Sequence, residues 1–178
     1  MQANLSPSSE PASWPLEATF DGGARRVQGR QVAGAGASLW RHRLDGPPEL
    51  VASAVAAVPG GATAQVAEAL GCRLAIDLLL REGSGVRAAR IVGDSTGIVR
   101  YGAGTAKLRR PEMQAHLDVG LANLAEAGWR LSWQAVRRRL NEAADTLAGE
   151  GEQMAAALAA AGRGEVVIEF RTGAGAGA

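Results

Sequence analysis

The order of strand and helix patterns is the feature of this sequence that most constrains its fold. Three strand-like segments come first, over residues 16–21, 31–41 and 49–58, with the glycine pair Gly22-Gly23 predicted to turn the chain after the first. Helical and strand-like segments then alternate to the end of the last helical pattern. Strands that alternate with helices are typical of α/β domains. We therefore expect an α/β fold, with a mixed five-stranded sheet flanked by helices.

Capping residues and apolar stripes predict where the helices lie. Thr63 can accept hydrogen bonds from the free amides of a first helical turn, and that helix ends near Gly83. Pro111 starts another helix, which Gly128 ends, and Asn141 caps the last one. Two stripes at helical spacing support the first two helices: Val66, Leu70, Leu74, Leu78 and Met113, Leu117, Leu121, Leu124. Residues 88–93 and 129–136 fit the fourth and fifth strands.

Composition predicts an unusual core and excludes several classes of protein. Alanine contributes 37 residues and glycine 24, whereas aromatic residues make up 4%, so small aliphatic side chains must fill the core. A chain of 178 residues with 47% hydrophobic residues can fold without a disulfide or metal staple, and it is neither disordered throughout nor fibrous. The single cysteine excludes a disulfide framework and a cysteine-rich zinc site.

Both ends of the chain differ in composition from the part between them. We expect residues 1–15 to be a flexible leader and residues 172–178 a disordered Gly/Ala tail. The first residues lack a basic region followed by an apolar one, so we expect no secretory signal, and the longest apolar run, residues 154–161, is too short to span a bilayer. These features predict a soluble, intracellular protein with no membrane partner, and they leave cytoplasm and nucleus equally open.

Four acidic residues stand where α/β folds place their chemistry. Asp21 and Asp94 end predicted strands, and Glu68 and Asp145 lie in the first turns of predicted helices. They are separated by 47, 26 and 51 residues, so only folding could bring them together. An acid near a helix start also complements the helix dipole, which is a sufficient explanation for Glu68 or Asp145 alone. Asp21 and Asp94 require a partner, because a carboxylate that ends a buried strand destabilises the fold without one.

Four segments carry a resemblance to a known family. In chain order they are Asp21-Gly22-Gly23 with AGAGASLW at 33–40, AQVAEA at 64–69, IVGDS at 91–95 and RRLNEAADTLA at 138–148. This sequence of motifs resembles the first hairpin, the acid-bearing helix, the strand-end Gly-Asp-Ser and the closing helix of the ribonuclease H family. The resemblance covers about residues 16–150 and is closest to the short, reverse-transcriptase-associated or plant-like type. It predicts a catalytic domain over 16–150, followed by a helix/strand extension over 151–171.

The resemblance implies a metal-dependent nuclease. Asp21, Glu68, Asp94 and Asp145 would be the catalytic residues and the ligands of two Mg²⁺ or Mn²⁺ ions, with Asp21 bridging both. The family hydrolyses the RNA strand of RNA–DNA hybrids and leaves 5′-phosphate and 3′-hydroxyl ends. The electrostatics are consistent, since carboxylates about 4 Å apart repel by roughly 4 kcal/mol per pair at an effective dielectric near 20. Protons or divalent cations must separate such a cluster.

The charge, sorted by segment, predicts a nucleic-acid-binding flank. The net charge is +1 overall, but residues 100–141 carry +5, residues 21–45 carry +3 and residues 142–171 carry −4. Basic side chains beside a phosphate-cleaving site are suited to contact the nucleic-acid backbone. The residues predicted to contact the hybrid are Gly22, Gly23, Ser95, Lys107, Arg109, Arg110, Arg138 and Asn141.

Two departures from the family leave alternatives open. The family's loop histidine is absent, and Ala135 stands nearest to its position, which lowers the expected rate. Residues 165–170 favour an extra strand that could pair with the sheet edge or with a reverse transcriptase or other protein partner; otherwise we expect a monomer. The main alternative to an enzyme is a non-catalytic module of the same fold that binds nucleic acid or protein. A further alternative is a nuclease of this fold that acts on another substrate.

Overall fold

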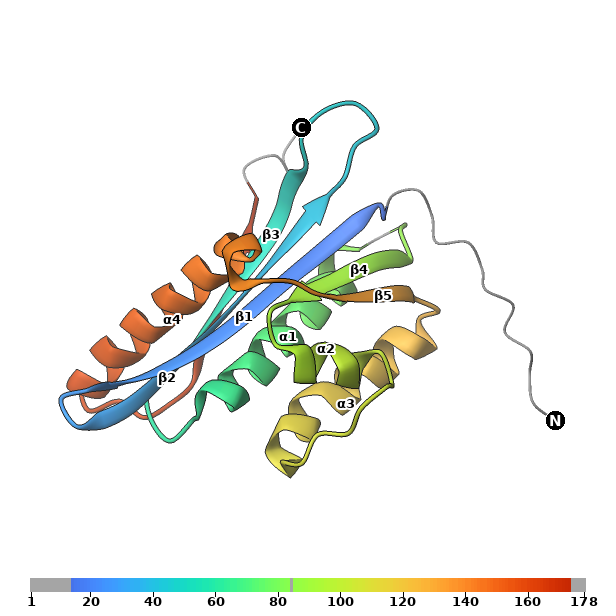
Figure 1. Ribbon diagram of the computed structural model, residues 1–178. Coiled ribbons are helices and arrows are strands. Elements are labelled where there is room, and N and C mark those ends of the chain that lie inside the picture. Colours follow the sequence, from blue (N-terminus) through green and yellow to red (C-terminus); the bar gives the residue numbers. More distant parts are fainter. Residues whose placement is uncertain (1–13, 84, 174–178) are drawn as a thin grey trace.

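A mixed sheet with helices on both faces forms the structure, a computed structural model that describes residues 14–83 and 85–173 (Figure 1). The strands and helices, in chain order, are β1 (Leu16–Val27), β2 (Arg30–Arg41), β3 (Glu49–Val58), α1 (Ala64–Glu82), β4 (Ala88–Gly93), α2 (Thr96–Gly102), α3 (Pro111–Glu126), β5 (Arg130–Ala135), η1 (Arg138–Leu140), α4 (Glu142–Ala160) and β6 (Val167–Thr172). No helix in the described residues is long and apolar enough to cross a membrane.

The sheet has six strands in the order β5-β4-β1-β2-β3-β6. β1 pairs antiparallel with β2 and parallel with β4, and β4 pairs parallel with β5, so the prediction of a mixed α/β sheet is confirmed. The predicted number of five strands was one too few, because β6 pairs antiparallel with β3 and extends the sheet. The short pattern at 165–170 predicted a strand, but only the fold shows that it pairs within the chain.

The first hairpin differs from its prediction, and glycine packing is the reason. β1 continues through Gly22 and Gly23 to Val27, and the chain turns at Gln28 and Gly29, both with positive φ. The glycine pair instead lets two helices approach the strand. A Cβ at Gly22 would lie 2.1 Å from the Ala67 carbonyl carbon of α1, and one at Gly23 would lie 2.3 Å from a Glu152 oxygen of α4.

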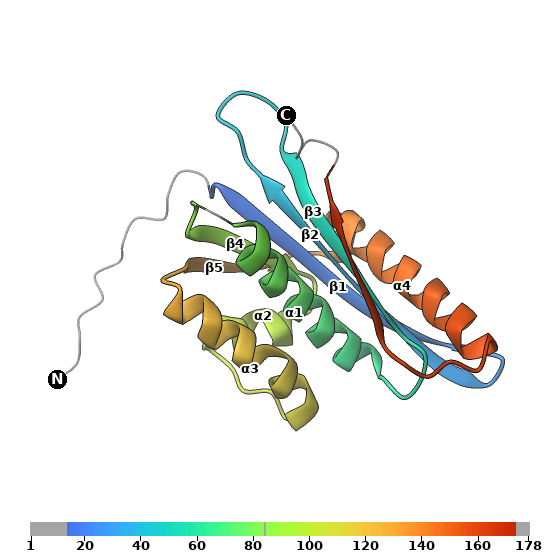
Figure 2. The ribbon, with the colours of Figure 1, turned by 180° about the vertical axis from the view of Figure 1, so that it is seen from behind.

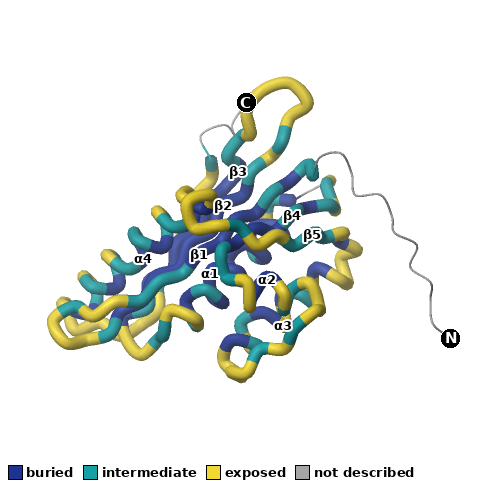
Figure 3. Tube along the Cα trace, in the orientation of Figure 1, coloured by how far each residue is buried: buried dark blue, intermediate teal, exposed yellow. Residues whose placement is uncertain are grey.

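The two long helices therefore lie on opposite faces of the sheet, because consecutive strand residues point to opposite sides. Figures 1 and 2 show α1, with α3 beside it, on one face and α4 on the other. The buried residues concentrate in the central strands and the helix surfaces that cover them (Figure 3). Alanines and glycines line the α4 side, and a Cβ at Gly34 would lie 2.3 Å from the Ala148 carbonyl oxygen. The small residues are what allow this close helix–sheet packing.

The predicted helix boundaries hold at most positions. The Thr63 hydroxyl accepts from the Val66 N–H at 3.3 Å, Gly83 follows the end of α1, and Pro111 occupies the first turn of α3. Two short elements, α2 and η1, were not predicted. Asn141 precedes α4 but makes no side-chain capping bond. Its amide instead donates to the Phe20 carbonyl of β1 at 2.8 Å.

The ends of the chain extend the fold more than the sequence predicted. Thr172, placed in the predicted tail, belongs to β6, and residues 174–178 lie outside the described residues. Of the predicted leader, Trp14 and Pro15 are described and residues 1–13 are not. α4 runs without a break across residue 150, so the predicted boundary between domain and extension divides one helix.

Candidate active site

Two of the four predicted acids lie beside each other at the end of neighbouring parallel strands. β1 and β4 stay paired as far as Phe20 and Gly93, and the next residues are Asp21 and Asp94. Asp21 is 4% exposed, and its Oδ1 accepts the Gly22 N–H at 2.7 Å. Asp94 is half-buried at the start of the loop to α2. Parallel strand ends that meet at one edge of a sheet are where α/β folds place ligand sites.

The close packing of α1 on β1 brings the third acid to this edge. Gly22 contacts the backbone at Ala67, the residue before Glu68, and Gly71 of the same helix contacts the Asp21 carbonyl oxygen. Glu68 is thereby held next to the strand ends. Ser95, the residue after Asp94, donates its hydroxyl to Glu68 Oε2 at 2.7 Å. Three acids from β1, α1 and the loop after β4 therefore share one side of the site.

The fourth acid comes from the other face of the sheet and has a basic partner. Asp145 lies in the first turn of α4. The Arg138 guanidinium donates to Asp145 Oδ1 from Nε at 3.0 Å and from Nη2 at 2.6 Å. Both side chains are open to solvent, with 75% of Arg138 and 42% of Asp145 exposed. The structure thus brings all four acids together, but it leaves this corner more open than the rest.

The pKa values record how closely the acids interact. The pKa of Asp21 rises to about 7, first through burial, then through the charge of Asp94 and through the hydrogen bond and charge of Asp145, while the Gly22 N–H opposes the rise. The pKa of Glu68 is also raised, again mainly by burial and partly by Asp94, against the opposing hydrogen bond from Ser95. Burial among like charges favours protonated carboxyls, and a bound cation would relieve the same repulsion. Perturbed carboxyls of this kind mark candidate functional sites.

The four carboxylates are suitable ligands for a hard divalent cation, although their oxygens do not all point to one position. Clustered carboxylate oxygens are the ligands that Mg²⁺ and Mn²⁺ prefer. Within residues 14–83 and 85–173, no three acidic, histidine or cysteine side chains are placed so that they could hold a metal ion as they stand. The contacts explain this, since Ser95 engages Glu68 and Arg138 engages Asp145. Small side-chain rotations would be needed on binding.

A groove beside Glu68 collects the predicted basic contacts. Its volume is about 460 Å³, and its lining includes Glu68, Ser95, Lys107, Arg109 and Arg110. The three basic side chains therefore line the same groove as Glu68, which is a proposed metal ligand. The prediction that this segment flanks the acids is consistent with the groove.

The other predicted nucleic-acid contacts differ in how accessible they are. Arg138 is exposed beside Asp145, and Ser95 faces both Glu68 and the groove. Gly22 and Gly23 pack against α1 and α4, so their first role is to permit the helix contacts. Asn141 is 2% exposed and bonded to Phe20, which places its side chain in the interior rather than on the nucleic-acid-facing surface. It ties the start of α4 to β1, next to Asp21.

Glu152 is a site residue that the sequence reasoning missed. It lines the same cavity of about 160 Å³ as Asp21, Arg138 and Asp145. It also forms an ion pair with Arg25 of β1 at 3.2 Å. A signal was present in the sequence, because Glu152 follows Asp145 by seven residues and two helical turns bring such residues to the same face.

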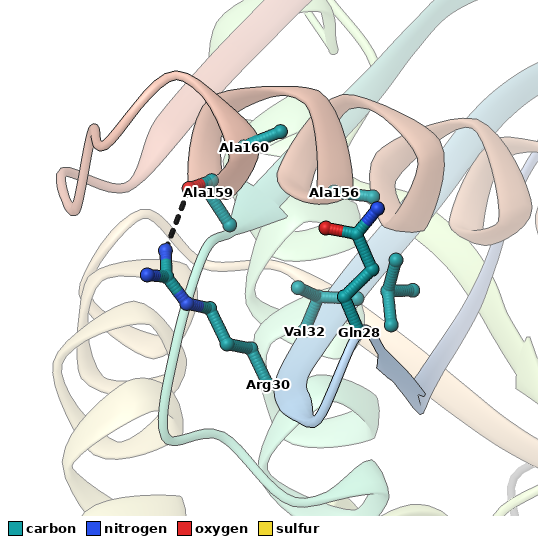
Figure 4. A pocket seen from close by; sticks show the side chains of 7 residues that line it. Gln28, Arg30, Val32, Ala156, Ala159 and Ala160 are labelled. Carbon is teal, nitrogen blue, oxygen red and sulfur yellow. Dashed lines mark hydrogen bonds between the residues drawn. The ribbon is translucent and has the colours of Figure 1, made fainter.

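Another cavity lies away from the acids. It has a volume of about 260 Å³ and lies between the β1–β2 turn and the C-terminal end of α4 (Figure 4). Arg30 donates to the Ala159 carbonyl oxygen at its edge, at 2.8 Å, and alanines and valines supply most of its lining. With no carboxylate in its lining, it lacks the chemistry of the acidic site.

The arrangement of the sheet and its helices is that of a ribonuclease H-like domain. Residues 19–151 match the family model described as reverse transcriptase-like, which is most of the chain. The chain therefore belongs to the reverse transcriptase-like family of ribonuclease H domains. No curated protein matches the sequence significantly.

Solved structures agree with this assignment. The N-terminal RNase H domain of Rv2228c from Mycobacterium tuberculosis, solved as a fusion with maltose-binding protein, is similar at 28% identity and a TM-score of 0.68, over 83% of this chain and 99% of that one. RNase H1 from Halobacterium salinarum is similar at 25% identity and a TM-score of 0.60, over 78% and 98%. LC11-RNase H1, solved in complex with an RNA/DNA hybrid, shares the fold at 21% identity and a TM-score of 0.58, over 79% and 98%. These relationships support a ribonuclease H-type function.

Proposed function

We propose that this protein hydrolyses the RNA strand of RNA–DNA hybrids and leaves 5′-phosphate and 3′-hydroxyl ends. The observation that carries the proposal is the meeting of Asp21, Glu68, Asp94 and Asp145 from four separate elements at one end of the β1–β4 pair. The family membership and the likeness to RNase H domains support the same substrate class.

In this proposal the four carboxylates would hold two Mg²⁺ or Mn²⁺ ions. Such ions, when bound, activate a water as the nucleophile and stabilise the leaving 3′ oxygen of an in-line displacement. Asp21 is already held in place by the Gly22 N–H, and Ser95 orients Glu68. Arg138, once released from Asp145, is placed to contact a phosphate of the substrate. Lys107, Arg109 and Arg110 line the groove along which the phosphate backbone would pass.

Recognition of the hybrid would depend on shape rather than on base sequence. The groove cations can neutralise phosphates but do not read bases. The 2′-hydroxyls of the RNA strand distinguish it from DNA at a given position. We therefore expect cleavage with little sequence preference.

The test is cleavage of an end-labelled RNA–DNA hybrid with Mg²⁺ or Mn²⁺, with identification of the new ends. Asp94→Asn should remove the activity while the circular dichroism spectrum stays unchanged. Asp77→Asn is the matched control. Asp77 lies on α1, the helix that carries Glu68, but it forms an ion pair with Arg73 of the same helix at 2.8 Å. Absent cleavage by the wild type, or equal cleavage by Asp94→Asn, contradicts the proposal. Double-stranded RNA and DNA, tested in parallel, distinguish a nuclease with another substrate.

One observation favours the second candidate, a non-catalytic module that binds nucleic acid. Arg138 already neutralises Asp145, and no three acids in the described part of the chain are gathered as metal ligands. A degenerate site would look similar. Titration with Mn²⁺ separates the two candidates, since a working site should raise the melting temperature by several degrees at saturation and a degenerate site should not change it.

A further inference from the structure

β6 is the outer strand of the sheet, and its outer side is open. It pairs with β3 on one side, and in the described residues no strand pairs with the other (Figure 2). Large apolar side chains on and next to this strand are exposed, namely Val166 at 52%, Ile168 at 45% and Phe170 at 36%. An edge strand exposes unpaired backbone groups that can pair with another strand, unless proline, a bulge or charged side chains oppose it. β6 contains no proline and no bulge, and its two charged side chains, Glu169 and Arg171, have opposite signs.

The hydrogen-bond pattern shows which backbone groups face the open side. The Gly173 N–H donates to the Val51 carbonyl oxygen of β3 at 2.8 Å. Alternate residues of an antiparallel strand bond to the same neighbour. Residues 169 and 171 therefore also face β3, and the backbone groups of Ile168, Phe170 and Thr172 point away from the sheet.

The side chains of β6 separate into an apolar and a charged set. Arg171 donates to Glu150 of α4 at 2.7 Å, so Glu169 and Arg171 lie on the α4 face. The Arg81 guanidinium of α1 lies 4.2 Å from the centre of the Phe170 ring, so Ile168 and Phe170 lie on the α1 face. The charged set contains one acid and one base at positions that flank Phe170.

We propose that β6 pairs antiparallel with β6 of a second copy of this chain, about a two-fold axis at Phe170. In this register Glu169 lies opposite the partner's Arg171, and Phe170 lies opposite the partner's Phe170. Opposite charges directly across an antiparallel pair are stabilising, and like charges are destabilising. A two-fold axis at Glu169 or at Arg171 would place like charges opposite each other. Of the axes at Glu169, Phe170 and Arg171, only the one at Phe170 places opposite charges across the pair, and in that register the two sheets join into one.

The dimer should be reversible and should leave the acidic site open. One pair of short strands buries less surface than a stable interface of about 1,200–2,000 Å² requires, so association depends on concentration. β2 and β3 separate β6 from β1, where Asp21 lies. The proposal is thus independent of hydrolysis and of metal binding, and either could fail without the other.

Sedimentation velocity of the full chain, from about 1 to 200 μM, tests the proposal in the concentration range expected for a weak interface. The mass should rise with concentration towards twice the 18.3 kDa of one chain. Glu169→Arg places arginines opposite the partner's Arg171 and should remain monomeric throughout. Phe170→Pro removes an outward-facing N–H without touching the bonds to β3 and should also be monomeric. Glu126→Arg, the same charge reversal at an exposed position of α3, is the control and should dimerise as the wild type does.

A mixture of two variants tests the register itself. Glu169→Arg and Arg171→Glu should each be monomeric alone, because each places like charges across the axis. Mixed in equal amounts, they place opposite charges across it and should sediment as a dimer. Circular dichroism must show that every variant is folded. A wild type that stays monomeric at all concentrations, a dimeric Glu169→Arg variant or a monomeric mixture overturns the proposal.

Discussion

The acidic site has two halves that differ in how firmly the fold holds them. In the first half, which we call the strand-end half, Asp21 is 4% exposed and the glycine contacts between β1 and α1 place Glu68 beside it. In the second half, the loop half, the exposed Arg138 of η1 holds the part-exposed Asp145 of α4. The backbone of the strand-end half cannot move without displacing a helix. The loop half can change by rotating two exposed side chains.

This difference indicates how a cation site can exist in a fold whose carboxylates repel each other. The buried half has a proton available, since the pKa of Asp21 is raised to about 7. The open half has a guanidinium instead. Metal binding would displace both, and the larger rearrangement would fall in the half that is free to move. Preorganisation of one half keeps the entropy loss on binding small.

The largest expected effect comes from removing the charge of the strand-end half. Asp21→Asn should lower the proposed hydrolysis by at least about 10³-fold, because the proposed site would lose the acid that would hold both ions. Cleavage of the labelled hybrid under single-turnover conditions measures this. A loss smaller than about tenfold would show that the strand-end half is not the centre of the site.

The raised pKa of Asp21 also predicts how the stability of the protein depends on pH. Because the pKa of Asp21 is about 7 in the folded protein, against an ordinary value of 3.8 for an aspartate in an unfolded chain, the folded state binds more protons between these pH values. Stability of the metal-free protein should therefore fall as pH rises from about 4 through 7, by as much as about 4 kcal/mol from this group. Asp21→Asn should flatten the dependence, and Mg²⁺ should stabilise the wild type more at pH 8 than at pH 5. Calorimetric melting at the two pH values tests both; a wild-type profile as flat as the variant's would contradict them.

Gly22→Ala should disrupt the strand-end half through packing alone. The added Cβ would meet the Ala67 backbone at 2.1 Å, so α1 must move away from β1 and carry Glu68 with it. We expect a loss of about 2–4 kcal/mol in the free energy of unfolding, measured by urea denaturation. Gly60→Ala is the control, because a Cβ there meets no atom within 4 Å and should change stability little. Equal stabilities for the two variants would show that the contact is not tight.

Arg138→Ala should free Asp145 of the loop half from its ion pair. With the competing guanidinium removed, Mn²⁺ should bind about two- to fivefold more tightly, as expected for an exposed ion pair worth less than about 1 kcal/mol. Isothermal titration calorimetry measures the change. Arg139→Ala, at the neighbouring exposed position, should leave the affinity unchanged. If both variants behave alike, Arg138 does not compete with the metal.

The smallest effect is expected from Arg109, a cation of the groove that belongs to neither half. Arg109→Ala should raise KM for the hybrid about two- to fivefold, leave kcat unchanged and reduce the salt dependence of binding by about one unit of slope. Steady-state cleavage at several salt concentrations tests this, with Arg41→Ala at the far end of β2 as the control. A change in kcat would place Arg109 nearer the reacting groups than the groove suggests.

Local patterns were sufficient for much of the fold. Thr63, Pro111 and the apolar stripes located α1 and α3, because capping and helical periodicity depend on neighbours a few residues away. The same patterns failed at the Gly22-Gly23 pair, since a glycine that permits close packing and a glycine that permits a turn look alike in sequence. They also failed at Asn141, whose partner Phe20 is 121 residues away.

The sequence by itself determined the class of the fold, the small-residue core and the four acids in their order along the chain. Only the tertiary structure decided which groups meet those acids: Ser95 beside Glu68, Arg138 beside Asp145, and Glu152 in the same cavity. It also decided that β6 pairs with β3 and forms an edge of the sheet. The physical reason is the range of the interactions. Periodicity and capping act within a few residues, whereas burial, ion pairing and strand pairing join segments whose separation no local pattern records.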